Sequence, residues 1–391
     1  MLKMVDGTGI IGVDMVCPLG GAVSPPQPPN YDNVEMEGMG SLTLQNSLKA
    51  PLERLELIGN SVQGENPAPD NPQEIKSAGR FDEASGKYLL DVKVTGKNLF
   101  DLTKYDKYDD TWTNTTYTTK KLKLKPNTTY TMSCKRLVDK PKQYVFFLVE
   151  EGIASGRGIY VQVTPDLSVN YFISKGTFTT NDTGEITLSY YVDCPKEQYW
   201  FTEVIGDIQI EEGSKETPYE PYTEQTLTLT SDRPITKWDK LVEQDGQIGW
   251  LYQSAAKEYI GDNSVELYDT GFYFKLSDKK IVNGEGYCKE LKQYVHREEN
   301  PCIAFNMSAN IYAYTLNTQE IYGSTVSEIK EYLKIHPLHL VYKTEATEFV
   351  PLSESEQTQL RNLHSYNGTT NITVDSGEVP CGIKLTYRKE K

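Results

Sequence analysis

The sequence predicts a mainly β protein: a jelly-roll β-sandwich and a C-terminal mixed β domain with two short helices, preceded by an extended N-terminal arm. Apolar residues alternate with polar ones in many short runs, for example Leu90, Val92 and Val94. Turn-forming residues separate these runs at regular spacing, as in β-sandwiches. Tyrosine, which favours strands, occurs 27 times against 11 Phe and 4 Trp.

Residues 1–45 are expected to form an arm. The segment "SPPQPPNYDN" is a proline-rich, semi-rigid spacer. The arm is either a disordered tail or a segment that orders against a neighbouring subunit, since its apolar start needs cover. Asp6 and Asp14 interrupt that start, so we do not expect a signal peptide. No apolar run approaches ~18 residues, so we expect no membrane span.

Residues 46–96 are predicted to be a β arm that leads into the sandwich. In "SLKAPLERLELIGNSVQ" the spacing of Leu48, Leu52 and Leu55 is helical, whereas Leu55 and Leu57 alternate as in a strand. A turn-rich loop, "GENPAPDNPQEIKSAG", follows. The segment "KYLLDVKVTGKNLFD" then reads as a strand.

Residues 97–224 are predicted to form the sandwich, with ~8 strands. The runs "KKLKLKPNTTYTMSCKRLV", "QYVFFLVEE", "KGTFTTNDTGEITLSYYVD" and "QYWFTEVIGDIQIEE" alternate or are continuously apolar. The prolines of "ETPYEPY" restrict the chain after the last strand and place a boundary near residue 224. Tyr219 and Tyr222 are expected to pack across that boundary with their hydroxyls in water.

Residues 225–391 are predicted to be β-rich with two helices. Asp245-Gly246 is a strong hairpin signal. "STVSEIKEYLKIHP" predicts a helix capped by Ser324 or Thr325 and ended by a proline. "SESEQTQLRNLHSYNG" predicts a second helix with a capping box, Ser353 and Glu356. The last segment, "TNITVDSGEVPCGIKLTYRKEK", predicts a pair of strands.

Charge and cysteine usage restrict the partners and cofactors. The chain has 391 residues with 40 Lys plus Arg against 55 Asp plus Glu, a net charge of -15. A negative field opposes binding to the nucleic-acid backbone. None of the six cysteines lies in a CxxC pair, so we expect no zinc cluster and mostly reduced, structural thiols.

Residue patterns favour no catalytic mechanism, so we do not expect an enzyme. His336 and His339 are separated by Pro337 and are expected at a helix end and a strand edge rather than on a metal. The glycines of "GIASGRGIY" do not have phosphate-loop spacing, and no GxSxG occurs. The acidic pairs 109–110 and 211–212 are interpreted as solvated turns and sheet edges. A glycoside hydrolase, which needs two carboxylates at a defined separation, remains an alternative.

Carbohydrate binding is the favoured small-molecule role. Jelly-roll sandwiches hold glycans by stacking a pyranose on an exposed aromatic ring. Trp112 lies in the polar loop "DDTWTNTTY" and is the first candidate, with Tyr117, Tyr144 and Trp200 as weaker ones. For Trp112, glycan contact, subunit contact and surface packing remain open. Trp200 lies in an apolar strand, where a core position is the alternative.

Several motifs in a fixed order carry a resemblance to a known family. They include "VTGKNLFD", "LKPNTTYTMS", "IQIEEGSKETPYEPY" and "YLKIHPLHLVYKTEATEFVPLSESEQTQLRNLHSYNGTTNITVD". Together they resemble tail and baseplate structural proteins of phages and prophages of Firmicutes, over residues 45–391. Within that family, residues 97–222 are similar to carbohydrate-binding modules of jelly-roll type, and "APLERLELIGNSVQ" is a strand.

The resemblance implies a non-enzymatic virion protein at the tail tip or baseplate, assembled in the cytoplasm of the bacterial host. Its implied partners are other tail or baseplate proteins, further copies of itself, often as a trimer, and host cell-surface polysaccharide. A head-decoration or neck protein is another alternative. No cofactor is expected; structural calcium stays open because such modules often carry it, although no acids here have the spacing of a calcium loop.

Overall fold

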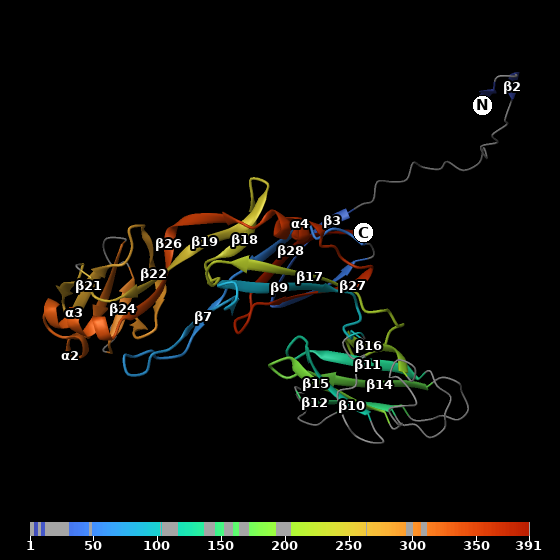
Figure 1. Ribbon diagram of the computed structural model, residues 1–391, viewed down its shortest axis with the longest axis horizontal. Coiled ribbons are helices and arrows are strands. Elements are labelled where there is room, and N and C mark those ends of the chain that lie inside the picture. The colour runs from blue at the N-terminus through green and yellow to red at the C-terminus, as the bar shows by residue number, and fades with distance from the viewer. Residues whose placement is uncertain are drawn as a thin grey trace.

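A computed structural model describes residues 4–6, 9–11, 31–46, 49–101, 103, 116–136, 145–151, 159–163, 172–192, 205–262, 264–294, 300–305 and 311–390. The prediction of a mainly β fold is confirmed, since strands dominate and the described part of the chain contains three short helices. Figure 1 shows three bodies: a central sandwich, a second sandwich beside it, and a distal lobe at the far end from both termini.

The central sandwich consists of two sheets. One has the strand order β22-β26-β19-β18-β5-β28-β3, and the other β17-β9-β27-β4 with β8 beside β9. Their bounds are β3 (Tyr31–Met39), β4 (Ser41–Asn46), β5 (Arg54–Ile58), β8 (Arg80–Asp82), β9 (Lys87–Thr95), β17 (Glu224–Ser231), β18 (Lys240–Gln244), β19 (Gln247–Tyr259), β22 (Ile281–Cys288), β26 (Leu338–Pro351), β27 (Gly368–Asp375) and β28 (Gly382–Glu390).

Alternation along the strands builds the core between these sheets. Leu90, Val92 and Val94 of β9 are fully buried, as their spacing predicted. From the facing sheet, Leu57 of β5 and Trp250 of β19 enter the same cluster. Strands far apart in the sequence therefore share one core.

The second sandwich lies between β9 and β17 in the sequence. Its sheets have the orders β10-β15-β12-β13 and β14-β11-β16, and the chain passes repeatedly from one sheet to the other, except between β12 and β13, which pair in the same sheet. Buried residues include Met132 of β11 and Ile186 and Leu188 of β15. The bounds are β10 (Thr116–Lys123), β11 (Thr129–Arg136), β12 (Val145–Glu151), β13 (Ile159–Val163), β14 (Phe172–Thr179), β15 (Glu185–Val192) and β16 (Ile205–Glu212).

The distal lobe has its own sheet, with the order β20-β21-β25-β24-β23, and its own core. Phe272 and Phe274 of β21 pack in that core with Ile329 and Leu333 of α3. The bounds are β20 (Glu266–Tyr268), β21 (Gly271–Lys275), β23 (Lys292–Gln293), β24 (Cys302–Phe305), β25 (Tyr312–Leu316), α2 (Gln319–Tyr322) and α3 (Val326–Ile335). Two small hairpins complete the strands: β1 (Met4–Asp6) with β2 (Gly9–Ile11), and β6 (Ser61–Gln63) with β7 (Ile75–Ser77).

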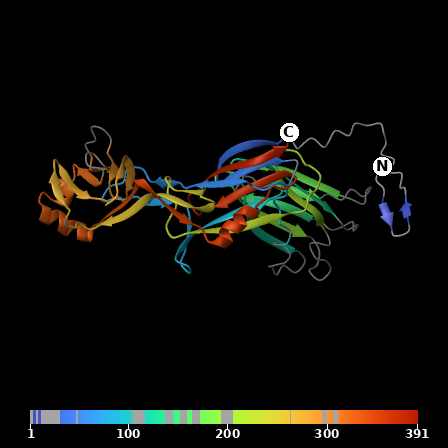
Figure 2. The ribbon, with the colours of Figure 1, turned by 90° about the horizontal axis from the view of Figure 1, so that it is seen from above.

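Both outer bodies are insertions between neighbouring strands of the central sandwich. The chain leaves for the second sandwich after Thr95 and returns at Glu224, which is the direct partner of Thr95 across the β9–β17 ladder. It enters the distal lobe after Tyr259 and returns at Leu338, which is the partner of Tyr259 across the β19–β26 ladder. Figure 2 shows the elongated outline and the narrow waist before the distal lobe.

This nesting differs from the consecutive segments expected from the sequence. β3 and β4 pair into the two central sheets, so residues 31–45 belong to the folded body rather than to the predicted arm. The segments 46–96 and 225–391 share both central sheets. β27 and β28, expected as a pair, lie in different sheets. Alternation identifies strands but carries no information about which distant strand completes the ladder.

The local signals for turns and helices are confirmed. Asp245 and Gly246 have φ of 51° and 78° and form the β18–β19 turn. Thr325 and Ser353 cap α3 and α4 (Glu354–Asn362), each with a complete capping box. The segment "APLERLELIGNSVQ" contains β5 and β6. The four-residue helix α2 was not predicted, because so short a segment has no detectable periodicity.

Polar side chains hold the second sandwich where the chain enters and leaves it. The Asn98 amide donates to the carbonyl oxygens of Ile208 and Glu220 at 2.9 and 3.0 Å, and its oxygen accepts from the Ile210 N–H at 3.2 Å. The Glu211 carboxylate accepts from the Thr217 N–H and hydroxyl at 2.8 and 2.6 Å.

Glu211 corrects one expectation. The pair 211–212 was interpreted as solvated, but Glu211 is only 2% exposed, because it binds the chain that leaves the sandwich. Glu212 does lie at the surface, where it accepts from the Lys125 ammonium at 2.7 Å. Asp109 and Asp110 lie outside the described residues.

A buried carboxylate shapes the strand that leads to the distal lobe. Asp239 is fully buried and accepts from the Thr236 N–H and hydroxyl at 2.9 and 2.6 Å. It also accepts from the Gln253 N–H at 2.8 Å and the Ser254 hydroxyl at 2.7 Å. The β19–β26 register shifts between Tyr252 and Ser254, so Asp239 stabilises a β-bulge in β19.

We predict that Asp239→Asn lowers the free energy of unfolding by about 3 kcal/mol, because the amide nitrogen cannot accept from the surrounding donors. Urea unfolding followed by tryptophan fluorescence measures the loss. The matched control is Asp245→Asn in the exposed hairpin turn, where Asn also tolerates positive φ and stability should be unchanged. Equal stability of the two variants would show that Asp239 is dispensable.

We predict that Asn98→Ala loosens the attachment of the second sandwich, because three hydrogen bonds of that side chain join the two chain ends of the insertion. Limited proteolysis should cut within residues 213–223 about tenfold faster, corresponding to ~1.4 kcal/mol of local stability. Asn71→Ala, in an exposed loop, is the control. An unchanged cleavage rate in Asn98→Ala would contradict the role of these bonds.

Candidate functional site

The predicted carbohydrate-binding residues fall where the structure describes no side chain. Trp112, Tyr144 and Trp200 lie outside the described residues. Tyr117 is placed in β10, opposite Tyr191 of β15, but its side chain is also outside the described set. The glycine-rich segment 152–158 is likewise not described. The hollows lined by described side chains lie on the central sandwich and at its junction with the distal lobe.

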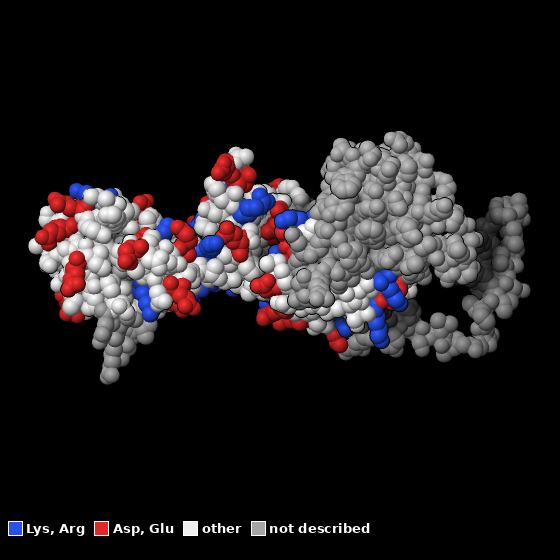
Figure 3. All heavy atoms as spheres, turned by 90° about the horizontal axis from the view of Figure 1, so that it is seen from below, with Lys and Arg blue, Asp and Glu red and all other residues white. Residues whose placement is uncertain are grey.

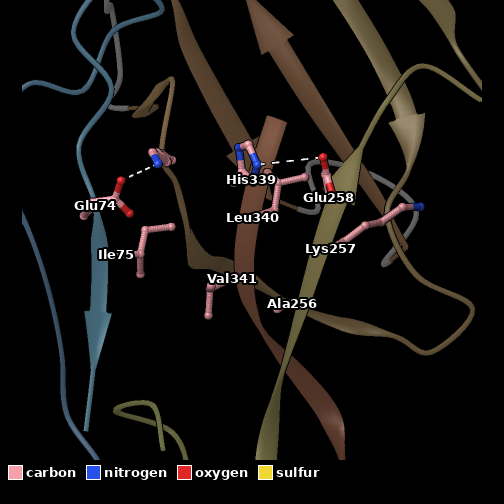
Figure 4. Close-up of a pocket in the computed structure, with 9 residues that line it drawn as sticks. Glu74, Ile75, Ala256, Lys257, Glu258, His339, Leu340 and Val341 are labelled. Carbon is pink, nitrogen blue, oxygen red and sulfur yellow. Dashed lines mark ion pairs between the residues drawn. The ribbon is translucent and has the colours of Figure 1, made fainter. Parts of the chain in front are cut away.

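One hollow, which we call the β26 groove, lies on the waist between these two bodies. It has a volume of about 350 Å³. Its walls come from β19, β26, the chain before β7 and the residue after β22 (Figure 4). The lining residues are Glu74, Ile75, Ala256, Lys257, Glu258, Lys289, His339, Leu340 and Val341.

His339 is the central polar group of the β26 groove. Leu338 and Leu340 point into the core, so alternation places His339 on the outer face of β26. Its Nδ1 lies 2.7 Å from Glu290 Oε1, and its backbone N–H donates to Glu290 Oε2 at 2.8 Å. Its Nε2 lies 3.9 Å from Glu258 on the neighbouring strand, as Figure 4 shows.

The opposite wall is a loop of the central body that docks on the distal lobe. The Gln63 amide donates to the carbonyl oxygen of Cys288 at 2.7 Å, and the Gln73 N–H donates to that of Lys289 at 2.8 Å. Glu74 and Lys289 form an ion pair across the groove wall. The groove therefore exists because the β6–β7 hairpin reaches over the edge strand β22.

The β26 groove contains several ionisable side chains. Glu290 orients the His339 imidazole, as a carboxylate does in acid–base pairs. The ionisable residues of the lining are Glu74, Lys257, Glu258, Lys289 and His339. Over the described part of the chain, no group of three His, Cys, Asp or Glu side chains could hold a metal ion. The groove offers an apolar floor with charged groups at its rim.

Sequence reasoning did not predict this site. His336 and His339 were expected to cap a helix end or to lie at a strand edge; His336 is the C-cap of α3, and His339 lies in β26, between β22 and β19. Glu74, Lys289 and Glu290 were missed. They approach His339 only through the docking of the β6–β7 hairpin and β22, and no local pattern signals that contact.

A second, smaller hollow of about 250 Å³ lies beside Tyr252 on the central sandwich. The Arg233 guanidinium stacks over the Tyr252 ring at 3.7 Å and pairs with Glu348 at 3.1 Å. The Tyr252 hydroxyl lies 2.7 Å from the Ser231 hydroxyl. These groups satisfy one another, so we assign this hollow a structural role.

Two cysteine thiols of the described chain, Cys288 and Cys381, are buried and have low reactivity. Cys288 and Cys381 take part in no disulfide. Burial raises the pKa of the Cys288 thiol, and it raises the pKa of Cys381 to about 11. Because the thiolate is the reactive form, both thiols stay protonated and unreactive near neutral pH.

Figure 3 shows Asp and Glu interspersed with Lys and Arg over the distal lobe and the central body. No helix among the described residues has the length and apolar character needed to cross a membrane.

Comparisons with known proteins add no functional information. No family model matches the chain, and no curated protein does. A solved structure of a mutant of Bacillus subtilis oxalate decarboxylase aligns with 85% of this chain and 79% of that chain, at 9% identity and a TM-score of 0.09. A likeness of that size carries no argument.

We predict that alkylation of the native protein at about pH 8 leaves Cys288 and Cys381 unmodified, because their pKa values are raised and their sulfur atoms are buried. In urea both should react, at least ~100-fold faster. Peptide mass spectrometry after iodoacetamide treatment gives the rate at each cysteine. Rapid native labelling of either thiol would contradict their placement in the cores.

Proposed function

We propose that this chain is a non-enzymatic structural protein of a phage virion, placed at the tail tip or baseplate, whose second sandwich presents a surface for host cell-wall glycans. The phage assignment rests on the ordered motifs described above. The same resemblance suggests a homo-oligomer, with other tail or baseplate proteins as partners.

The observation that carries a structural role is the way the bodies are joined. Each outer body leaves and re-enters the central sandwich through paired strands, Thr95 with Glu224 and Tyr259 with Leu338. A two-stranded ladder transmits load and keeps orientation better than a single flexible linker. Such a build suits a part that must hold binding surfaces at fixed positions on a particle.

The arrangement of ionisable groups in the β26 groove also favours a non-catalytic role. Glu74 pairs with Lys289, and His339 pairs with Glu290. These pairs bind segments of the chain to one another. An enzyme would instead direct such groups at a substrate.

We predict that the full chain binds purified wall polysaccharide of a Gram-positive host, and that Trp112→Ala weakens this binding roughly tenfold, because a stacked ring is lost. Affinity electrophoresis measures the change. The control is Tyr219→Ala, which removes an exposed ring from the chain that leaves the sandwich. Unchanged affinity in Trp112→Ala would remove that residue from the binding surface.

The hydrolase alternative is tested on the same preparations. A glycosidase releases reducing ends from wall glycans, whereas a binding protein releases none between about pH 4 and 8. Release of reducing ends by the wild-type chain would overturn the non-enzymatic assignment.

A further inference from the structure

The distal lobe carries a cluster of tyrosines on the sheet face that points away from its core. Phe272 and Phe274 of β21 are fully buried against the lobe core, so alternation turns Tyr273 to the opposite face. Tyr273 lies directly opposite Tyr314 of β25, and Glu266 of β20 lies on its other side. Cross-strand neighbours share a face, so these side chains project together.

Four rings make up this cluster, which we call the tyrosine face: Tyr268, Tyr273, Tyr312 and Tyr314. Tyr314 is only 6% exposed and forms its centre. Tyr268 meets it edge-on with ring centroids 5.2 Å apart, and Tyr273 stacks on it at 5.3 Å. Tyr312 meets Tyr273 at 5.5 Å and 73°.

The rings support one another and remain open to ligands. Tyr268 is 38% exposed, and Tyr273 and Tyr312 are partly exposed. Each ring has a neighbour that restricts its rotation, so a ligand that stacks here orders few side chains on binding. Figure 1 shows this lobe at the end of the molecule farthest from both chain termini.

Polar groups stand at the rim of the tyrosine face. The Tyr273 hydroxyl donates to the Glu266 carboxylate, and the Lys275 ammonium lies 2.5 Å from the Asp278 carboxylate. The hydrogen bond to Glu266 raises the pKa of Tyr273 to about 12, so the phenol remains a neutral donor. Acceptors and donors thus flank the aromatic surface.

We propose that the tyrosine face is a binding site for an uncharged polysaccharide, with a pyranose ring stacked on Tyr268 and Tyr273 and its hydroxyl groups bonded to the rim. An aromatic platform with carboxylate and ammonium groups at its edge is the chemistry that recognises a sugar.

The negative charge of the chain and of the rim favours a neutral polysaccharide over an anionic one. The chain carries a net charge of -15, and two of the three charged rim residues, Glu266 and Asp278, are acidic. A phosphate-bearing polymer such as teichoic acid, or a nucleic acid, would be repelled by these groups. Neutral hexose, deoxyhexose or N-acetylhexosamine polymers would not. All residues of the tyrosine face lie in the distal lobe, so this site is independent of the phage assignment and of the second sandwich.

The full chain should first be screened on an array of neutral oligosaccharides of glucose, galactose, rhamnose and N-acetylhexosamine, with ribitol teichoic acid as the anionic comparison. The best neutral ligand is then titrated by calorimetry. Tyr268→Ala should weaken binding roughly tenfold, and Tyr268→Phe, which keeps the ring, should stay within about twofold. Phe81→Ala removes a ring that is 53% exposed on the central body and should change nothing.

Each other outcome overturns the inference. These outcomes are no binding to any neutral glycan on the array, stronger binding of teichoic acid, or equal affinity in wild type and Tyr268→Ala. Size-exclusion chromatography adds one more: an oligomer that Tyr268→Ala dissociates would make the tyrosine face a subunit interface. Thermal unfolding shows whether Tyr268→Ala remains folded.

Glycan binding by Trp112→Ala and by Tyr268→Ala, measured side by side, distinguishes the two proposed sites. Loss of binding in Trp112→Ala with normal binding in Tyr268→Ala places the ligand on the second sandwich, which supports the proposed function and overturns the tyrosine-face site. The reverse pattern supports the tyrosine face and removes the glycan role from the sandwich.

Discussion

Antiparallel pairing between β9 and β17, and between β19 and β26, is the constraint on which the rest of this structure depends. Each pair both completes a central sheet and carries the two chain ends of an insertion. Backbone hydrogen bonds along a ladder are numerous and directional, so they hold the two chain ends of each outer body beside each other. The two ladders therefore fix where each outer body joins the central sandwich.

The same ladders make the central core a long-range structure. Leu42, Leu90, Leu227 and Ile372 belong to one cluster, although the second sandwich separates β9 from β17 in the sequence. The distal lobe closes its core mainly with residues between Tyr259 and Tyr342. We therefore expect the insertions to fold on local contacts and the central sandwich to form last, because its contacts close the longest loops.

On the described surface, the ionisable groups at the waist and the aromatic groups of the tyrosine face differ in what they contact. At the waist, Glu290 and His339 bind to each other, and Glu74 holds the β6–β7 hairpin to Lys289. In these contacts the four side chains pair with one another across the β26 groove. On the tyrosine face the rings contact one another, and Tyr268, Tyr273 and Tyr312 keep part of their surface exposed.

The sequence by itself determined the elements with local causes. Alternation identified β9, an N-cap and a terminating proline identified α3, a capping box identified α4, and Asp245-Gly246 identified a hairpin, since each signal is local in the sequence. Only the tertiary structure decided which strands share a sheet, that Glu211 is buried, and that Tyr268 meets Tyr314. Those facts depend on pairing between segments distant in the chain, and an alternating pattern fits many partners equally well.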